Sequence, residues 1–278
     1  MRQLRDGVCV VAFVSAWVAT CGCFVARAQQ QAPEAACGGQ TIGRGVASRI
    51  IDGRTFALDD GSEVRLAAIE VPLPARGATA APAESAVRDG LFALLADTVL
   101  VLKQALPQKT DRYGRVVAYA FTARDGGRRS VQADLLASGL ARVAARVGDR
   151  GCASALLSAE NAARHGRLGL WASSYYDVLD AEDPAAVLAE RGRFALVEGS
   201  VVSVRESGAT IYVNFGRRWT TDFTVTIPKR NARSFTAAGL MPQTLAGRRI
   251  RVRGWIEERG GPWIEATRPE QIELIDRD

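Results

Sequence analysis

The sequence predicts an α+β protein in two parts, and three observations lead to that prediction. Short apolar runs separated by tight turns come first, segments with helical periodicity follow them, and alternating β-branched runs dominate residues 193–278. With 278 residues, 47% of them hydrophobic and 24% charged, the chain is long enough for one large or two modest cores. We therefore expect a larger α+β domain over residues 45–172 and a smaller, mostly β domain over residues 193–278.

The first 28 residues have the layout of a secretory signal peptide. Arg2 and Arg5 precede an apolar run from Val8 to Val25, and a small-residue pattern ends at Ala28. We expect cleavage after Ala28 and a mature protein that is exported, periplasmic or secreted, with no membrane span. A membrane anchor is the alternative, because the apolar run is nearly long enough to cross a bilayer.

Two cysteines remain after that cleavage. Cys37 lies in a mature N-terminal extension, residues 29–44, and Cys152 lies in a predicted helix, whereas the other three cysteines belong to the signal segment. Because an exported protein enters an oxidising compartment, we predict a disulfide between Cys37 and Cys152. Two unrelated buried thiols are the alternative.

Turns and caps set the elements of the first domain. Asp52-Gly53 and the turn at 59–61 separate apolar runs, Ser130 is a helix cap, and Gly139 ends that helix. The expected order is a β-meander over 45–71, a helix over 83–97, strands over 99–102 and 116–121, and helices over 130–139 and 152–171.

The rest of the chain divides into a linker and a β-rich domain. Residues 173–192 are predicted to be a linker with one short helix, capped by Asp183 and beginning at Pro184. Residues 193–278 contain five alternating strands with a helix between the third and fourth, which is the order of an OB-type barrel. They also hold 14 Lys and Arg against 10 Asp and Glu, which favours an anionic partner.

The sequence excludes several kinds of catalytic site. His165 is the only histidine, which removes Ser-His-Asp, Cys-His and His-based metal sites, and no Walker loop, GxGxxG turn or CxxC pair occurs. Two arginines that converge on one pocket would clamp a phosphate and neutralise charge during phosphoryl transfer. Solvated hairpin ends are the alternative. The charged residues at the strand ends are Asp52, Arg54, Arg65, Glu70, Asp111, Arg112 and Arg115.

Four motifs stand in order along the first domain. They are IDGRTFALDDGSEVRLAAIEVP, DRYGRVVAYAF, LLASGLARVA and LLSAENAARHGRLGLW. In order and spacing they resemble the thermonuclease family, the staphylococcal-nuclease-like domains. The resemblance implies a five-stranded OB-type barrel with three helices, and in active members a calcium-dependent phosphodiesterase that acts on DNA and RNA.

The resemblance assigns roles to several residues that are retained. Arg65 matches the first catalytic arginine, which contacts the scissile phosphate, and Arg115 matches the second, which stabilises the pentacoordinate phosphorus and the leaving group. Asp52 and Glu70 match remnant positions of the calcium site. We expect both arginines to bind substrate together with Arg54 and Tyr113.

Three positions depart from the family pattern. Arg54 stands where active members carry an aspartate that ligates calcium. Val71 stands at the position whose backbone carbonyl helps to hold the metal in active members. Leu73 follows Pro72 where a glutamate acts as general base on the attacking water. Loss of a positioned general base usually lowers the rate about 10²–10⁴-fold, and calcium would face a fixed positive charge at Arg54.

We predict that Arg54 forms an ion pair with Glu70 and occupies the space of the calcium ion. No cofactor is therefore expected, with Ca²⁺ bound only if the altered site still holds metal. Three functions stay open: binding of single-stranded DNA or RNA or another polyanion, nuclease activity with a base from elsewhere such as Glu84, and a non-catalytic interaction role in the cell envelope.

The C-terminal domain offers a second candidate surface. In RRIRVRGW, strand periodicity places Arg249, Arg251 and Arg253 on one face. A basic face beside aromatic rings is typical of single-strand platforms, and a solvated strand face is the alternative. The neighbouring residues of this kind are Arg217, Arg218, Lys229, Arg230, Trp219 and Trp255.

Overall fold

The structure is a computed structural model, and it describes residues 36–72, 82–124 and 127–275. The predicted signal segment and Leu73 lie outside these residues, as does most of the small-residue loop that follows Leu73. Within the described ranges, no helix is both long and apolar enough to span a membrane.

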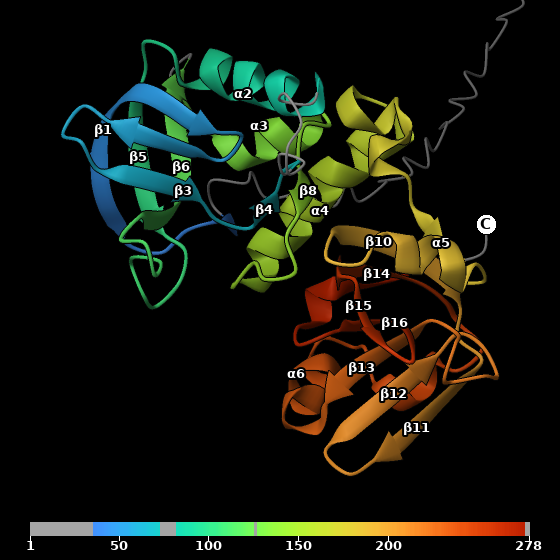
Figure 1. The fold of residues 1–278 in the computed structure, drawn as a ribbon. Coiled ribbons are helices and arrows are strands. Elements are labelled where there is room, and N and C mark those ends of the chain that lie inside the picture. The colour runs from blue at the N-terminus through green and yellow to red at the C-terminus, as the bar shows by residue number, and fades with distance from the viewer. Residues whose placement is uncertain (1–35, 73–81, 125–126, 276–278) are drawn as a thin grey trace, which may run out of the picture. The chain divides into compact units, whose positions relative to one another are not determined.

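Five strands of the first domain close into a barrel (Figure 1). Antiparallel pairs run in the order β3-β2-β1-β5-β6, and a parallel pairing of β3 with β6 closes the ring. One long strand, β1, turns the corner by pairing with β5 through residues 41–46 and with β2 through residues 47–52. The strands are β1 (Thr41–Asp52), β2 (Thr55–Leu58), β3 (Glu63–Leu66), β5 (Val99–Gln104) and β6 (Val116–Arg124). The α+β fold and the five-stranded barrel are thus confirmed.

Short strands extend this barrel. β7 (Gly127–Ser130) pairs with β6, and β4 (Ile69–Glu70) forms a separate two-stranded sheet with β8 (Arg142–Val143). β1 begins at Thr41, inside the segment that the sequence assigns to an N-terminal extension.

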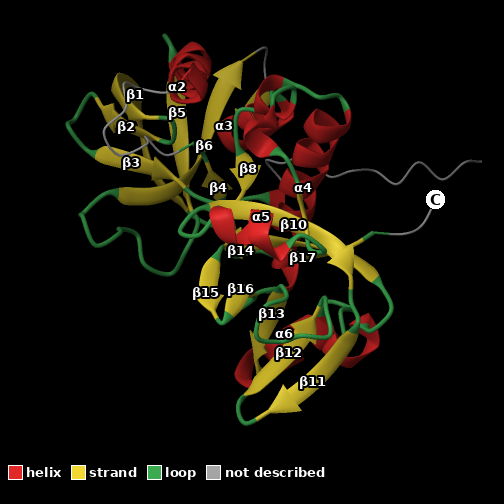
Figure 2. Cartoon of the chain, turned by 45° about the vertical axis from the view of Figure 1, so that its right-hand side comes forward, coloured by secondary structure: helices red, strands yellow, loops and turns green. Residues whose placement is uncertain are grey.

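Among the described residues, the α-helices of this domain are α2 (Pro82–Leu95), α3 (Val131–Ala137) and α4 (Arg150–His165). Figure 2 shows them in red beside the yellow barrel strands. The Ser130 hydroxyl accepts the N–H of Ala133, as expected of the helix cap. α4 ends at His165, before a 3-10 turn at Gly169–Trp171, so the expectation of one helix to Trp171 is wrong.

Helix α2 lies close to the turn between β1 and β2. A Cβ atom at Gly53 would lie 2.7 Å from Cγ1 of Val87 on α2, which is too close for a non-bonded contact. The absence of a side chain at Gly53 therefore lets the helix pack directly on the turn.

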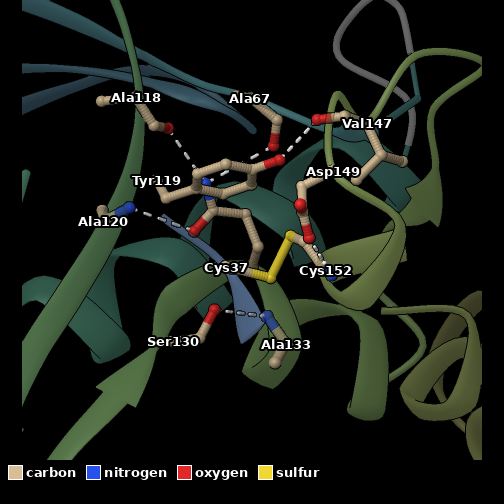
Figure 3. The surroundings of a disulfide bond; sticks show 11 residues. Cys37, Ala67, Ala118, Tyr119, Ala120, Ser130, Ala133, Val147, Asp149 and Cys152 are labelled. Carbon is tan, nitrogen blue, oxygen red and sulfur yellow. Dashed lines mark hydrogen bonds between the residues drawn. A yellow bond between two sulfur atoms is a disulfide. The ribbon is translucent and has the colours of Figure 1, made fainter. Parts of the chain in front are cut away.

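The predicted disulfide is present between Cys37 and Cys152 (Figure 3). The two Cα atoms are 4.4 Å apart, although 115 positions separate the cysteines in the sequence. The bond joins the segment before β1 to the first turn of α4, where Asp149 caps the helix by accepting the N–H of Cys152. The disulfide thus fastens the start of the barrel to its last helix.

The second part of the chain repeats the strand plan of the first barrel. β10 pairs antiparallel with β14, β11-β12-β13 form an antiparallel meander, and β13 pairs parallel with β16 as β3 does with β6. Helix α6 (Ala232–Ala237) follows the third strand of the meander, as the OB-type order predicts. The strands are β10 (Phe194–Ser200), β11 (Ser203–Ser207), β12 (Thr210–Asn214), β13 (Thr224–Pro228), β14 (Arg249–Trp255), β15 (Glu257–Arg259), β16 (Gly261–Glu265) and β17 (Ile272–Leu274).

These strands are divided between two sheets. One has the order β17-β14-β10-β9 and the other the order β11-β12-β13-β16-β15. The segment 173–192 supplies β9 (Leu179–Asp180), which pairs in parallel with β10, and the helix α5 (Pro184–Ala189). Asp183 accepts the N–H of Ala186 and so caps α5 as expected. The segment predicted to be a linker therefore contributes a strand to the second domain.

Arg253 on β14 is fully buried, and carboxylates from two other elements hold its guanidinium. Its two terminal nitrogens each lie 2.9 Å from an oxygen of Glu160 on α4. Nη2 also donates to Glu273 of β17 at 2.5 Å, and Nη1 donates to the carbonyl of Val143 at 3.1 Å. Burial acts to lower the pKa of Arg253, but Glu160 and Glu273 hold it above its ordinary value.

The basic platform expected on β14 is wrong. Besides the buried Arg253, Arg249 and Arg251 donate to the carboxylate of Glu198 on β10 at 2.9 and 2.5 Å. Strand periodicity predicts that the three guanidinium groups share a face, but it does not show that this face carries its own carboxylates.

Replacing both cysteines, Cys37→Ser with Cys152→Ser, is expected to lower the free energy of unfolding by about 2–4 kcal/mol. The reason is that the bond closes a long loop in the unfolded chain. Urea unfolding of the two proteins, each beginning at residue 29, measures the difference. Alkylation of the unreduced wild-type protein is the control, and two modified thiols there would contradict the bond.

Glu160→Ala is expected to lower the free energy of unfolding by about 3–5 kcal/mol, because it leaves the buried Arg253 without its bidentate partner. Glu190→Ala, which removes an exposed pair with Arg193, is the matched control and should cost less than about 1 kcal/mol. Urea unfolding measures both variants. Equal losses would show that the Glu160 pair is no stronger than a surface pair.

Candidate functional site

The turn between β1 and β2 fixes the backbone of Arg54. The carboxylate of Asp52 accepts the backbone N–H of Arg54 at 2.8 Å, as an aspartate at the start of a tight turn does. The carbonyl of Arg54 accepts the N–H of Leu66 on β3, also at 2.8 Å. Asp52 therefore shapes the turn, and the Arg54 side chain extends from it toward β4.

The Arg54 guanidinium ends on the short strand β4. Its Nη1 atom donates to Oε2 of Glu70 at 2.5 Å and to the carbonyl of Ile69 at 3.0 Å. Arg54 is only 9% exposed, so this pair is shielded from water and is stronger than a surface pair. The predicted ion pair between Arg54 and Glu70 is confirmed.

Two further arginines gather around Asp111. Arg115 donates to Oδ2 of Asp111 from Nε at 2.8 Å and lies 2.7 Å from it through Nη2. Nη1 of Arg65 lies 3.8 Å from the same oxygen. The fold brings the arginines together because β3 and β6 are parallel neighbours in which Val64 faces Val116, the residue after Arg115.

The charges around these groups do not cancel. Glu70 balances Arg54, whereas Arg65 and Arg115 share the single carboxylate of Asp111, so one positive charge is left over. Partial burial and then repulsion by Arg54 and Arg115 lower the pKa of Arg65, although a guanidinium stays protonated at neutral pH. The surplus positive charge around Arg65 and Arg115 is thus suited to an anion.

Asp111 is held in its ionised form. Burial acts to raise its pKa, but hydrogen bonds from the Arg115 side chain and from the backbone N–H groups of Tyr113 and Arg115 bring it below the ordinary value. Stability linked to this depressed pKa is present at neutral pH and is lost as the pH falls through it.

The Tyr113 ring lies at the tip of the loop before β6. It is 67% exposed, and the guanidinium carbons of Arg112 and Arg115 each lie 5.0 Å from its centre. Tyr113 is therefore grouped with Arg112 and Arg115, whereas Arg54 contacts Glu70.

The residues present do not fit a calcium ion. Calcium takes six to eight oxygen ligands, but Glu70 is engaged by Arg54, and Asp52 accepts a turn N–H. Among the residues that the structure describes, no three or more His, Cys, Asp or Glu side chains are grouped to hold a metal. Leu73, at the position of the general base, lies outside the described residues.

The sequence alone gives no sign that Arg142 lies opposite Glu70. Arg142 faces Glu70 in the β4–β8 pairing, is buried, and donates from Nη2 to the carbonyl of Phe194 at 2.6 Å. Its guanidinium also stacks on Tyr176, 4.4 Å from the ring centre. Nothing in LLASGLARVA marks this arginine as buried. The sequence shows Asp111 only as one of several charges at strand ends. Its spacing of four residues from Arg115 is the signal that it accepts hydrogen bonds from that arginine.

One family model matches part of the chain. Residues 63–173 match the family model described as staphylococcal nuclease homologue. The match covers less than half of the 278 residues and includes Arg65, Glu70 and Arg115. No curated protein matches the chain.

Arg54→Asp is expected to create or strengthen calcium binding, because it frees Glu70 and adds a carboxylate beside it. Calorimetry and the Ca²⁺ dependence of thermal unfolding measure this gain. Arg49→Asp, the same charge change at an exposed position of β1, is the control and should bind no calcium. Site-specific calcium binding by the wild-type protein that Glu70→Ala abolishes would overturn the Arg54 interpretation.

Proposed function

We propose that the first domain binds single-stranded DNA or RNA through Arg65 and Arg115 without ordinary calcium-dependent cleavage. The match of residues 63–173 to the family model described as staphylococcal nuclease homologue supports binding of nucleic acid. The carrying observation is the Arg54–Glu70 ion pair beside two arginines that share one carboxylate. This arrangement favours a site that binds phosphate but does not bind calcium.

Each arginine contributes differently to phosphate binding. Asp111 holds Arg115 by its Nε and Nη2 edge, which orients the guanidinium and leaves Nη1 for a ligand. With the described residues Arg65 makes only a long ion pair, and its side chain is 31% exposed, so it is the more accessible donor. A guanidinium bonds a phosphate through two parallel N–H donors. The exposed Tyr113 ring provides a surface on which a neighbouring base stacks.

Cleavage requires a base that the mapped position lacks. A leucine at position 73 accepts no proton, and the loss of a positioned base lowers the rate about 10²–10⁴-fold. The proposal therefore assigns the domain to binding. Export is part of the proposal, supported by the signal-like first segment and by a Cys37–Cys152 bond that an oxidising compartment preserves.

Metal-independent or reduced nuclease activity is the second candidate, and one observation favours it. Glu84 lies in the first turn of α2, the helix that packs on the 52–53 turn, and its Oε2 atom is buried without a hydrogen-bond partner. A general base must have an oxygen free to accept a proton, and this carboxylate oxygen has no partner among the described residues.

The test uses the chain from residue 29 and a labelled single-stranded oligonucleotide, with Ca²⁺, with other divalent ions and with chelator. We expect binding that weakens steeply with salt, is unaffected by chelator, and falls about tenfold or more in Arg65→Ala/Arg115→Ala. Arg44→Ala/Arg49→Ala, two exposed arginines of β1, controls for net charge.

Three outcomes decide between the candidates. Binding that weakens about tenfold or more only in the Arg65/Arg115 variant supports the proposal. Turnover that disappears in that variant and in Glu84→Gln establishes the nuclease instead. Equal binding by all variants contradicts a phosphate site at these arginines.

A further inference from the structure

A groove of about 790 Å³ lies on the C-terminal domain, along β11, β12 and the loop that follows β12. β11 and β12 run side by side (Figure 2), with Arg205 directly opposite Tyr212 and Ser203 opposite Asn214. Opposed residues of an antiparallel pair project from the same face. Ile211 and Val213 alternate with Tyr212 and are buried in the core, so the Tyr212 face is the outer one.

The loop after β12 adds an aromatic ring and a cation to this groove. Trp219 is 74% exposed, and both Trp219 and Arg217 line the groove. A large ring left in water at the edge of a hollow is unusual for a solvated loop and typical of a contact surface.

Asp222 holds this loop in one conformation. Its Oδ2 atom accepts the backbone N–H of Arg218 at 2.7 Å, and its own backbone N–H donates to the Arg218 carbonyl at 2.8 Å. A Cβ at Gly216 would lie 2.0 Å from Oδ2 of Asp222, so only glycine permits this closure. Phe215 and Phe223 pack at the base of the loop, with ring centres 5.0 Å apart. The groove wall is therefore pre-organised, which lowers the entropy lost on binding.

The groove has a positive excess. Glu206 is engaged by Lys229 at 2.9 Å and by Gln243 at 2.7 Å. Arg205 and Arg217 are exposed and have no ion pair with any residue that the structure describes. Two uncompensated guanidinium groups beside two accessible rings form the combination that binds phosphates and unstacked bases together.

We propose that this groove is a second binding site, for single-stranded nucleic acid, separate from Arg65 and Arg115. A base stacks on Trp219 or Tyr212 while Arg205 and Arg217 contact the adjoining phosphates. A duplex hides its base faces and is disfavoured. The site does not depend on the function proposed for the first domain, because its residues all come from β11, β12 and the following loop.

The experiment titrates the full chain from residue 29 with a fluorescein-labelled thymidine 12-mer and with a duplex of the same length. The background is Arg65→Ala/Arg115→Ala, which removes the first proposed site. We expect this background to retain binding to the single strand, and addition of Trp219→Ala with Arg205→Ala to weaken it about tenfold or more. Arg233→Ala with Arg268→Ala, exposed arginines elsewhere on the domain, should have little effect.

Trp219→Phe keeps a stacking ring at this position but removes the indole emission of residue 219. In the same background it should bind within about threefold of the unmodified groove, whereas the quenching of tryptophan fluorescence by the single strand should disappear. Each of three results overturns the proposal: equal affinity for the duplex, displacement by heparin with unchanged tryptophan emission, or a background variant that no longer binds the single strand. In the last case the proposal for the first site still stands, because replacing Arg65 and Arg115 alone abolished binding of the single strand.

Discussion

The guanidinium of Arg253 is a charge placed where water does not reach it, and the arrangement of the surrounding elements follows from that. A buried cation is tolerated only with carboxylates and carbonyls in fixed positions. Glu160 supplies two oxygens from α4, Glu273 supplies one from β17, and Val143 supplies its carbonyl from β8. β14, which the sequence alone suggests as a nucleic-acid platform, is therefore an internal strand fastened to a helix of the first domain.

The same constraint reaches the candidate site through β8. Glu160 also accepts the N–H of Val143 at 2.5 Å, so both the N–H and the carbonyl of that residue belong to the buried network. The preceding residue, Arg142, bonds the Phe194 carbonyl and lies opposite Glu70. The strand that pairs with Glu70 is thus held by two hydrogen bonds, one from Arg142 to the Phe194 carbonyl and one from Arg253 to the Val143 carbonyl.

Local chemistry made much of the fold predictable, and burial made the rest unpredictable. Ser130 and Asp183 have the side chains that cap helices, Asp52-Gly53 is a turn pair, and each of the two cysteines after residue 28 has only the other as a possible partner. The Arg54–Glu70 pair followed from charge balance once the family pattern was known. Periodicity placed Arg253 on a face but gave no sign that Glu160, 93 residues away, covers it. Arg142 was equally hidden, because its partners are a backbone carbonyl and two aromatic rings.

Under the proposed function, Arg54 explains how a metal position can be lost while the phosphate-binding arginines are kept. Two carboxylates facing each other without a cation repel, whereas a guanidinium facing one carboxylate attracts it and needs no ion. The replacement also adds a positive charge close enough to Arg65 to lower its pKa. Repulsion among like charges is relieved when an anion enters, so the substitution that disfavours calcium also favours phosphate. Under the proposed function, metal loss and anion binding are consequences of one residue, and calcium cannot return while Arg54 holds Glu70.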